Sequence, residues 1–355
     1  MPPTTMAAVV HYKLEEGAVE LRDVPCPDDL EGGEVLLQTQ AVGVCGSDVH
    51  QYHNTQSWRV NVPVILGHEF GGVVARVAKG FRGFKEGDRV VCETAAYVCG
   101  RCVYCRSGEY NLCPERLGFG YGVNGAMAEF VKVPGRCLHH LPASVTFDKA
   151  ALAEPCCVAY NATCVHARIR PGDAVLIIGP GPIGLLSLAL AKLAGASWIA
   201  AAGLKRDRDR LALAQSLGAH CTLDGSAEEN MAIIRSLGDG MGVDAVIDAA
   251  GHSSTLQFAL AAVRPKGQIT KVGWGPQPLN FSLDPLIQKA ARIQGSFSHN
   301  FPIWEKVISL LASGKLDPAP LIGRVEPLAQ WRVCFDEMAS GQAVKNVLAP
   351  TRHRE

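Results

Sequence analysis

The chain has 355 residues, more than one hydrophobic core usually serves, so we expect two domains. It carries 34 Lys and Arg against 34 Asp and Glu, and this balance excludes the net field that draws proteins to nucleic acids or acidic membranes. The 13 cysteines occur without a secretory signal pattern or an apolar run of membrane-spanning length. They favour metal sites and buried thiols in a reducing cytoplasm over disulfides.

Short β-like runs alternate with turns in the first part of the chain. Residues 8–10 and 34–40 have the composition of strands, and a turn rich in glycine lies at 31–33. This pattern predicts an antiparallel or barrel-like domain rather than β/α units.

Two segments bordered by glycine follow. Cys45 lies in Gly-Val-Cys-Gly-Ser-Asp-Val-His, and His68 and Glu69 lie in Gly-His-Glu some twenty residues later. Cys and His favour a cation such as zinc, to which Glu can add an oxygen ligand. Taken alone, Cys45 would be a buried thiol and His68 a hydrogen-bonded core histidine. Their joint occurrence upstream of the glycine motif described below favours a metal site.

A second cysteine group has spacings of two, two and seven residues: Cys99, Cys102, Cys105 and Cys113. Four thiolates without histidine in a loop-like segment predict a closed structural zinc site. The last gap is too long for a ferredoxin cluster motif. Only Arg101 and Arg106 lie inside the loop, whereas a nucleic-acid zinc module would carry clustered cations.

Glu154 stands at the start of an apolar run that continues to Ala162. Burying a carboxylate costs free energy unless it is paired or metal-bound. Glu154 is therefore a further candidate ligand, while the adjacent Cys156 and Cys157 have the character of small packed hydrophobes.

The strongest motif is a strand, a glycine turn and a helix in succession. The apolar run 175–178 leads into Gly-x-Gly-x-x-Gly, and an apolar stretch of helical length follows at 185–193. The three glycines allow a tight turn, the approach of a pyrophosphate and close packing of helix on strand, and the helix N-terminus attracts the phosphates. The candidate cofactor-binding residues of this turn are Gly179, Gly181, Pro182, Ile183 and Gly184.

Further β/α units follow this motif. Strands are expected at 198–202, 221–222, 244–249, 268–272 and 292–297. With the first strand they make six, which predicts a doubly wound parallel sheet. Beyond about residue 300 this rhythm ends, and an amphipathic helix is expected at 304–312.

The end of the second strand bears on cofactor choice. NAD-binding members of this fold carry an acidic residue there, but this chain has Gly203, nineteen positions after Gly184. Lys205 and Arg206 follow, and a guanidinium binds phosphate through two hydrogen bonds. We therefore favour NADP(H), with NAD(H) as the alternative in which Asp207 reaches the ribose.

Together, Cys-Gly-Ser-Asp-Val-His, Gly-His-Glu, the four-cysteine lobe and the glycine motif, in that order, resemble the zinc-dependent medium-chain dehydrogenase family. Sorbitol, threonine and simple alcohol dehydrogenases belong to it, and the resemblance spans nearly the whole chain. It implies an α/β fold in which a Rossmann cofactor domain (156–298) is inserted in a mainly β, GroES-like catalytic domain. That domain would comprise residues 1–155, with a zinc lobe at 93–115, and 299–355. The active site would lie between the two domains, in a homodimer or homotetramer.

The resemblance also implies roles for single residues. The catalytic zinc ligands would be Cys45, His68 and Glu154, with Glu69 as an exchangeable or additional ligand. Asp48 would orient His68, and Ser47 would hydrogen-bond the substrate oxygen. His50 would be the outer end of a proton relay through the cofactor ribose. Without the motif, Ser47 would be a turn-capping serine and His50 a surface histidine.

Two departures from sorbitol dehydrogenases concern the substrate. Gln51 stands where those enzymes typically carry a tyrosine, and Ser298-His299 replaces an Arg-Tyr pair after the last strand. They weigh against sorbitol itself and leave a polyol, a sugar derivative or another secondary alcohol, or its ketone, whose hydroxyl groups Ser298, His299 and Asn300 can hydrogen-bond. The alternatives are threonine dehydrogenase-like or simple alcohol dehydrogenase activity. A non-catalytic, crystallin-like binding protein is more remote, because the zinc ligands and Ser47 are all present.

Overall fold

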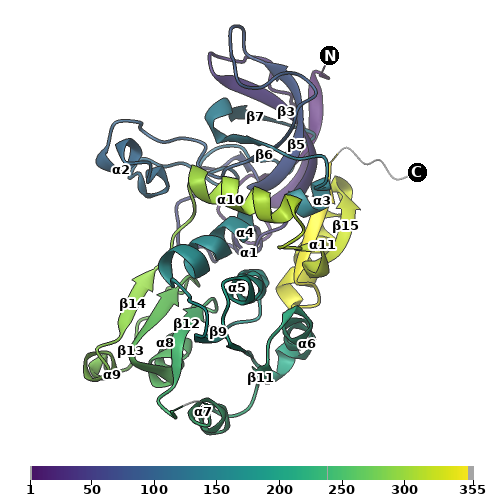
Figure 1. The fold of residues 1–355 in the computed structure, drawn as a ribbon. Coiled ribbons are helices and arrows are strands. Elements are labelled where there is room, and N and C mark those ends of the chain that lie inside the picture. Colours follow the sequence, from purple (N-terminus) through teal and green to yellow (C-terminus); the bar gives the residue numbers. More distant parts are fainter. Residues whose placement is uncertain (1, 238, 351–355) are drawn as a thin grey trace. The chain divides into compact units, whose positions relative to one another are not determined.

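The computed structural model describes residues 2–237 and 239–350. They form two compact units (Figure 1). The β-rich unit comprises the described residues up to Glu154 and from Asn300 onward. The parallel-sheet unit comprises Pro155–His299.

The β-rich unit is built on a seven-stranded sheet with the order β15-β16-β3-β5-β6-β8, in which β7 also pairs with β3. All of these pairings are antiparallel except that of β15 with β16. The strands are β3 (Glu34–Gly43), β5 (Glu69–Val77), β6 (Arg89–Cys92), β7 (Phe130–Pro134), β8 (Leu138–His140), β15 (Ile322–Pro327) and β16 (Lys345–Ala349). The expectation of a mainly antiparallel domain is confirmed.

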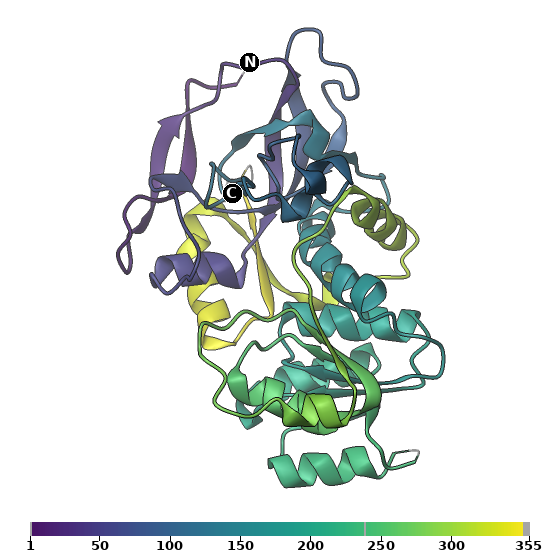
Figure 2. The same ribbon diagram turned by 90° about the vertical axis from the view of Figure 1, so that its left-hand side faces the viewer.

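A second sheet in this unit has the order β2-β1-β4, with β1 (Thr5–His11), β2 (Val19–Pro25) and β4 (Val64–Ile65). Its first two strands run side by side as the purple ribbon in Figure 2. The helices of the unit are α1 (Gly46–Tyr52), α2 (Val103–Arg106), α3 (Phe147–Ala150), α10 (Phe301–Ala312) and α11 (Trp331–Ser340).

The return segment completes the core of the β-rich unit. Trp331 and Phe335 of α11 are buried in the same apolar cluster as Leu37 of β3 and Phe70 of β5. The rings of Trp331 and Phe335 meet edge to face, with centroids 5.2 Å apart. Because burial of large aromatic side chains contributes strongly to stability, α11 is an integral part of this unit's fold.

The parallel-sheet unit has six strands in the order β11-β10-β9-β12-β13-β14, all parallel. They are β9 (Ala174–Ile178), β10 (Trp198–Ala202), β11 (Cys221–Leu223), β12 (Val243–Asp248), β13 (Val263–Lys271) and β14 (Arg292–Gly295). This order is that of a doubly wound dinucleotide-binding sheet. The six expected strands are confirmed, although β13 begins five residues earlier and β14 ends two residues earlier than expected.

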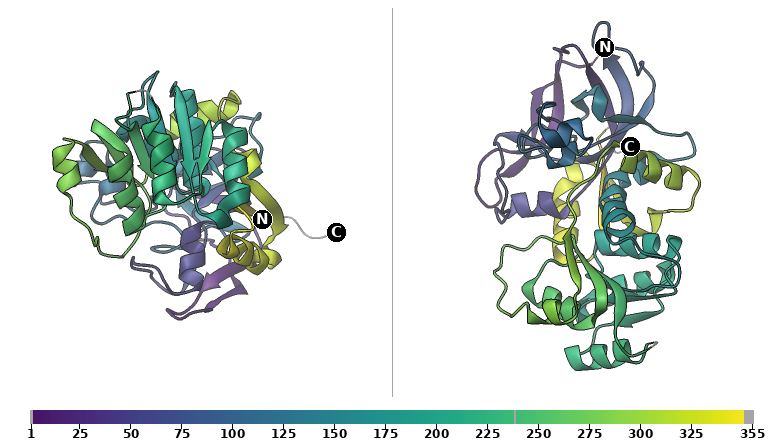
Figure 3. Two further views of the ribbon diagram at one scale, coloured as in Figure 1. Left: turned by 90° about the horizontal axis from the view of Figure 1, so that it is seen from below. Right: turned by 60° about the vertical axis from the view of Figure 1, so that its left-hand side comes forward.

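Helices cover both faces of this sheet (Figure 3). They are α5 (Pro182–Leu193), α6 (Arg208–Leu217), α7 (Ala227–Arg235), α8 (Ser253–Ala262) and α9 (Asp284–Gln288), and α4 (Ala153–Tyr160) begins at the boundary of the two units. Buried Leu176 of β9 and Val246 of β12 lie in one apolar cluster with Leu260 of α8. Among the helices in the described ranges, none combines the length and apolar character that crossing a bilayer requires.

Candidate metal and cofactor sites

The pairing of β3 with β5 brings the two glycine-bordered segments together. Gly43, the last residue of β3, lies opposite Glu69, the first residue of β5, in the antiparallel register. Cys45 follows the end of β3, and His68 precedes the start of β5. A Cβ on Gly43 would lie 2.3 Å from Glu69 Oε2, so this position requires glycine if Glu69 is to keep its place.

Helix α1 begins at the first candidate ligand. Cys45 is its N-cap, and Asp48 accepts a hydrogen bond from the Cys45 N–H at 2.8 Å through Oδ2. The other carboxylate oxygen, Oδ1, lies 3.8 Å from His68 Nδ1. Neither of these two buried atoms has a hydrogen-bond partner among the described residues. If His68 binds a metal through Nε2, its other ring nitrogen, Nδ1, faces Asp48. A residue that orients a metal-binding histidine lies on this side of the ring.

Three donor atoms, from Cys45, His68 and Glu69, lie within 4.8 Å of one another. Burial alone would lower the pKa of His68. The negative charges of Cys45, Asp48 and Glu154 have the larger effect, and the pKa of His68 therefore lies well above its usual value. Thiolate, imidazole and carboxylate are the donor set that zinc prefers. The buried anions and this donor set together fit a zinc ion.

Glu154 is not a member of this group of three. It is buried, and its Oε1 accepts a hydrogen bond from Thr94 Oγ1 at 3.1 Å. Its charge still raises the pKa values of His68, Glu69 and Lys345, so it belongs to the same neighbourhood. Its role as the third ligand stays a prediction.

The main feature that sequence reasoning missed is the partner of Glu69. Lys345 of β16 is 1 % exposed, and its Nζ lies 2.5 Å from Glu69 Oε1. Burial raises the pKa of Glu69, and Lys345 opposes that rise. A buried carboxylate paired with an ammonium group already has a counter-charge without a metal, which supports an exchangeable rather than a permanent role for Glu69.

The proposed proton-transfer groups lie on one face of α1, because residues three apart on a helix are neighbours. Ser47 Oγ is 3.5 Å from His68 Nε2, at the metal cluster. His50 is exposed, and its Nδ1 lies 2.8 Å from Thr55 Oγ1. Partial burial, with His53 nearby, lowers the pKa of His50.

The four-cysteine lobe forms a second cluster, with the sulfur atoms of Cys99, Cys102, Cys105 and Cys113 within 4.8 Å of one another. Backbone N–H groups point at three of these sulfurs at 3.4 Å. Hydrogen bonds from the backbone N–H groups of Arg101 and Cys102 lower the pKa of Cys99 to about 7. Donors of this kind stabilise thiolates, which a closed zinc site needs.

A buried polar network attaches the lobe to the sheet. Tyr110 Oη donates to the Glu93 carboxylate, whose two oxygens lie at 2.8 and 2.7 Å. His139 Nε2 lies 3.0 Å from Glu93 Oε1, and His139 Nδ1 lies 2.6 Å from Glu305 Oε1. The lobe is therefore connected through Tyr110 to β8 and α10. We expect that disorder in the lobe would break these hydrogen bonds and destabilise the β-rich unit.

We expect Cys102→Ser to remove one metal ion and to lower the stability of the fold, because binding energy at a structural site contributes to folding. A loss of a few kcal/mol would lower Tm by roughly 5–10 °C in a chain of this size. Elemental analysis and thermal unfolding are the measurements. Cys221→Ser, at a half-buried cysteine outside both clusters, is the control, and unchanged metal content in Cys102→Ser would refute the assignment.

In the parallel-sheet unit, the glycine turn joins β9 to α5 as expected. Gly179 has φ 93°, and a Cβ on Gly184 would lie 1.9 Å from the Gly179 carbonyl oxygen. Gly181 is the N-cap of α5, with Pro182 at the first helical position. A Cβ on Gly181 would meet nothing within 4 Å, so the space beside this glycine is open, and free backbone N–H groups at a helix N-terminus attract an anion such as a pyrophosphate.

The second strand, β10, ends immediately before Gly203. Lys205 and Arg206 are exposed. Asp207 Oδ2 accepts a hydrogen bond from the Leu204 N–H at 2.9 Å and caps the short turn before α6. This engagement argues against Asp207 as the ribose-binding carboxylate.

The structure also revises the significance of two positions considered for substrate choice. Gln51 is 0 % exposed, and its side chain donates to the Gly120 carbonyl at 3.1 Å. It therefore holds the irregular segment 118–125 instead of facing a substrate. Of the expected hydroxyl-binding residues, His299 is buried, and Asn300 Nδ2 donates to the Gly108 carbonyl at 3.1 Å.

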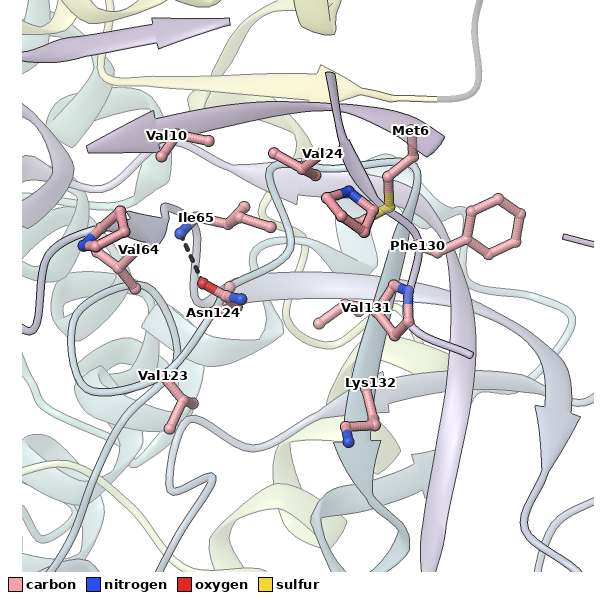
Figure 4. Close-up of a pocket in the computed structure, with 14 residues that line it drawn as sticks. Met6, Val10, Val24, Val64, Ile65, Val123, Asn124, Phe130, Val131 and Lys132 are labelled. Carbon is pink, nitrogen blue, oxygen red and sulfur yellow. Dashed lines mark hydrogen bonds between the residues drawn. The ribbon is translucent and has the colours of Figure 1, made fainter. Parts of the chain in front are cut away.

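A pocket of about 510 Å³ lies elsewhere in the β-rich unit (Figure 4). Apolar side chains of β1, β2, β4 and β7 line it, among them Met6, Val24 and Ile65, and Asn124 accepts a hydrogen bond from the Ile65 N–H at 3.0 Å. None of the predicted site residues lines this pocket, so it is not the site of the metal chemistry.

Comparisons with known proteins agree with this geometry. The model of the alcohol dehydrogenase GroES-like domain matches residues 31–143, and that of the zinc-binding dehydrogenase matches residues 182–313. A sorbitol dehydrogenase of Halalkalibacterium halodurans is 36 % identical over 97 % of this chain and 99 % of its own length. The chain belongs to the zinc-type medium-chain dehydrogenase family.

Two other proteins support this membership. A D-arabitol-phosphate dehydrogenase of Enterococcus avium is 37 % identical over 88 % of each chain. The crystal structure of a zinc-binding dehydrogenase from Sinorhizobium meliloti 1021, bound to NADP, has a TM-score of 0.90 at 28 % identity and covers 98 % of this chain and 100 % of its own. As a zinc-type medium-chain dehydrogenase, this protein is an oxidoreductase of alcohols that uses a nicotinamide cofactor.

Proposed function

We propose that this protein interconverts a secondary alcohol of the polyol or sugar class and its ketone, with two zinc ions per chain and NADP(H) as the preferred cofactor. The observation that carries the proposal is the cluster of Cys45, His68 and Glu69 within 4.8 Å, with Ser47 Oγ 3.5 Å from His68 Nε2. The chain resembles a sorbitol dehydrogenase and a D-arabitol-phosphate dehydrogenase, and their names support a substrate of the polyol or sugar class.

The β-rich unit would supply the catalytic groups. Cys45, His68 and a carboxylate, Glu154 or Glu69, would hold the catalytic zinc. Bound zinc supplies Lewis acidity that lowers the pKa of an alcohol, and the nicotinamide accepts the hydride. Asp48, whose Oδ1 lies 3.8 Å from His68 Nδ1, would orient the His68 ring, and Lys345 would keep Glu69 at the same cluster.

Ser47 and His50 would move the proton. The Ser47 hydroxyl would take up the proton of the alcohol as it passes its own proton outward. Exposed His50 would take up one proton and release one to water. Partial burial lowers the pKa of His50, which favours the neutral ring that can accept a proton.

We expect Ser47→Ala to lower kcat by about 10²-fold or more, the range for loss of a proton-transfer group. His50→Gln should cost less, about tenfold, because water can replace an exposed base. The His50→Gln effect should be largest at low pH, where hydroxide is scarce, and added buffer should rescue it. His140→Gln, at an exposed histidine of β8, is the control. An unchanged pH profile in both variants would reject the relay.

The cofactor would bind to the parallel-sheet unit, with its pyrophosphate at the N-terminus of α5 and the 2′-phosphate near Lys205 and Arg206. Gly203 supports NADP(H) because it offers neither charge nor bulk against that phosphate. NAD(H) remains the alternative.

We also propose a homodimer or homotetramer. All four residues of β14 are exposed at the edge of the sheet, and Ile287 nearby is 76 % exposed. An exposed edge strand can pair with the same strand of a second copy. Sedimentation velocity measures the mass against the 37.8 kDa of one chain.

A substrate panel tests the proposed reaction. Polyols, sugar alcohols and their phosphates, L-threonine and simple secondary alcohols are each assayed with NAD and with NADP, and the ketones are assayed with the reduced cofactors. We expect the highest kcat/KM with a polyol or sugar derivative. A preference for threonine or a simple alcohol would select the corresponding alternative. Absence of turnover, with nucleotide still bound, would select the non-catalytic binding protein.

A further inference from the structure

A buried carboxylate lies at the carboxyl end of β12 in the parallel-sheet unit. Asp248 is 0 % exposed, and its Oδ1 accepts hydrogen bonds from the N–H groups of Ala250 and Gly251 at 3.1 and 3.2 Å. The same oxygen accepts a hydrogen bond from Thr255 Oγ1 of α8 at 3.1 Å. Asp248 therefore holds both the turn after β12 and the helix that follows.

Lys271 is the partner of Asp248 across the sheet. It is the last residue of β13 and lies opposite Asp248 in the parallel register. Its Nζ lies 3.3 Å from Asp248 Oδ2 and donates to the Gly273 carbonyl at 2.9 Å. The ammonium group thus ties the buried carboxylate to the turn after β13.

These two turns pack backbone against backbone. A Cβ on Gly251 would lie 2.2 Å from the Trp274 carbonyl oxygen, and one on Gly275 would lie 1.9 Å from the Gly251 carbonyl oxygen. On the other side, a Cβ on Gly179 of the glycine turn would lie 3.0 Å from Ala250 Cβ. Because no flexible side chain separates these backbones, a displacement of one turn will displace the others.

The turns lie where a doubly wound sheet binds its ligand. The strand order reverses between β9 and β12, and ligands of this fold bind there, at the carboxyl ends of the strands. Ile178, the last residue of β9, lies opposite Asp248. The adenine-side ribose is bound at the end of β10. The turns after β12 and β13 therefore face the nicotinamide half of a dinucleotide.

We propose that the Asp248–Lys271 pair positions the nicotinamide half of the cofactor by holding turns 249–251 and 272–275 as one rigid surface. This inference rests on the proposed function, because it requires a nicotinamide dinucleotide as ligand. Lys271 acts through the backbone of Gly273 and is a positioning residue. Without Lys271, Asp248 keeps its three other donors, so the end of β12 stays folded while the tie between the turns is lost.

The test separates the two halves of the cofactor. Lys271→Met removes the ammonium group and keeps an unbranched side chain that reaches the position of Cε. The probes are NADPH and NADH, which carry both halves, and adenosine 2′,5′-bisphosphate and ADP-ribose, which lack nicotinamide. We expect the Kd of the preferred reduced dinucleotide to rise about tenfold, as for loss of a charged hydrogen bond, while the Kd of the matching fragment stays unchanged. The fluorescence shift of the bound dihydronicotinamide should diminish.

Arg264→Met is the matched control. Arg264 of β13 pairs with Asp244 of β12 at 3.1 Å, between the same two strands but at their amino-terminal ends. A loss of strand pairing alone would lower Tm in both variants without changing the ratio of dinucleotide to fragment affinity. The positioning role predicts a changed ratio in Lys271→Met only, with recovery in Lys271→Arg.

A second variant, Asp248→Asn, tests the same inference if Lys271→Met does not fold. Asp248→Asn keeps an oxygen for the Ala250 and Gly251 N–H groups but loses the charge that holds Lys271, and the same change in ratio is expected. An unchanged ratio in a folded Lys271→Met or Asp248→Asn protein overturns the inference. If the unmodified protein binds neither dinucleotide, the proposed function itself fails.

Discussion

Cys45→Ser should lower kcat by about a thousandfold or more, because loss of a metal ligand removes several kcal/mol of transition-state stabilisation. The fold should survive. Cys45 lies at the end of β3 as the N-cap of α1, and a serine side chain can occupy an N-cap position. Far-UV circular dichroism measures the secondary structure, thermal unfolding measures the stability, and steady-state kinetics with the best substrate of the panel measure kcat.

Metal content distinguishes the two clusters. We expect about two zinc ions in the unmodified chain and about one in Cys45→Ser, with the lobe site still filled. Cys102→Ser gives the reciprocal control. It should lose the lobe metal and unfold at a lower temperature, while the folded protein keeps its catalytic activity. Full activity of the unmodified protein with one metal ion or none would refute the two-site assignment.

The parallel-sheet unit was predictable because its signals are local. The branched run before Gly179 and the apolar run after Gly184 each specify one element, and the glycine spacing specifies the turn between them. The later strands followed from the same alternation of apolar runs and helical segments. Their ends were less certain, because β13 continues through Pro265 and Gly267, residues that usually interrupt a strand.

The metal cluster was predictable only in part. Cys45, His68 and Glu69 lie near one another in sequence and carry recognisable chemistry. Lys345 could not be found in this way, because it lies 276 positions from Glu69 in a strand of ordinary composition. It reaches the cluster because β16 pairs with the end of β3, where Val347 lies opposite Gly43.

Burial also changed the interpretation of residues that had seemed to face the substrate. Gln51 follows the motif histidine, and its position alone pointed to substrate choice. Its amide instead lies between His11 Nδ1 and the Gly120 carbonyl in the interior of the β-rich unit. A buried amide must find such partners, so a difference from sorbitol dehydrogenases at this position is first a difference in packing.

The double variant Gly203→Asp with Arg206→Ala should shift cofactor preference from NADP towards NAD. The aspartate would bind the ribose hydroxyls and repel the 2′-phosphate, and the loss of Arg206 would remove a charge-assisted hydrogen bond to it. A Cβ at position 203 would lie 3.0 Å from Pro180 Cγ and 3.3 Å from Leu211 Cδ2, so both side chains must move by a few tenths of an ångström. The fold should accept this change.

The expected measure is the ratio of kcat/KM with NAD to kcat/KM with NADP, which should rise about a hundredfold when one charged contact is lost and another gained. Arg208→Ala, which removes a neighbouring exposed charge at the start of α6, is the control for a general electrostatic effect. Lys205→Ala tests the second cation. Asp207 is unsuited to replace the new aspartate, because its carboxylate already caps the Leu204 N–H. If the unmodified protein has the higher kcat/KM with NAD, the preference for NADP is wrong, and the ribose must then be bound without a carboxylate at the end of β10.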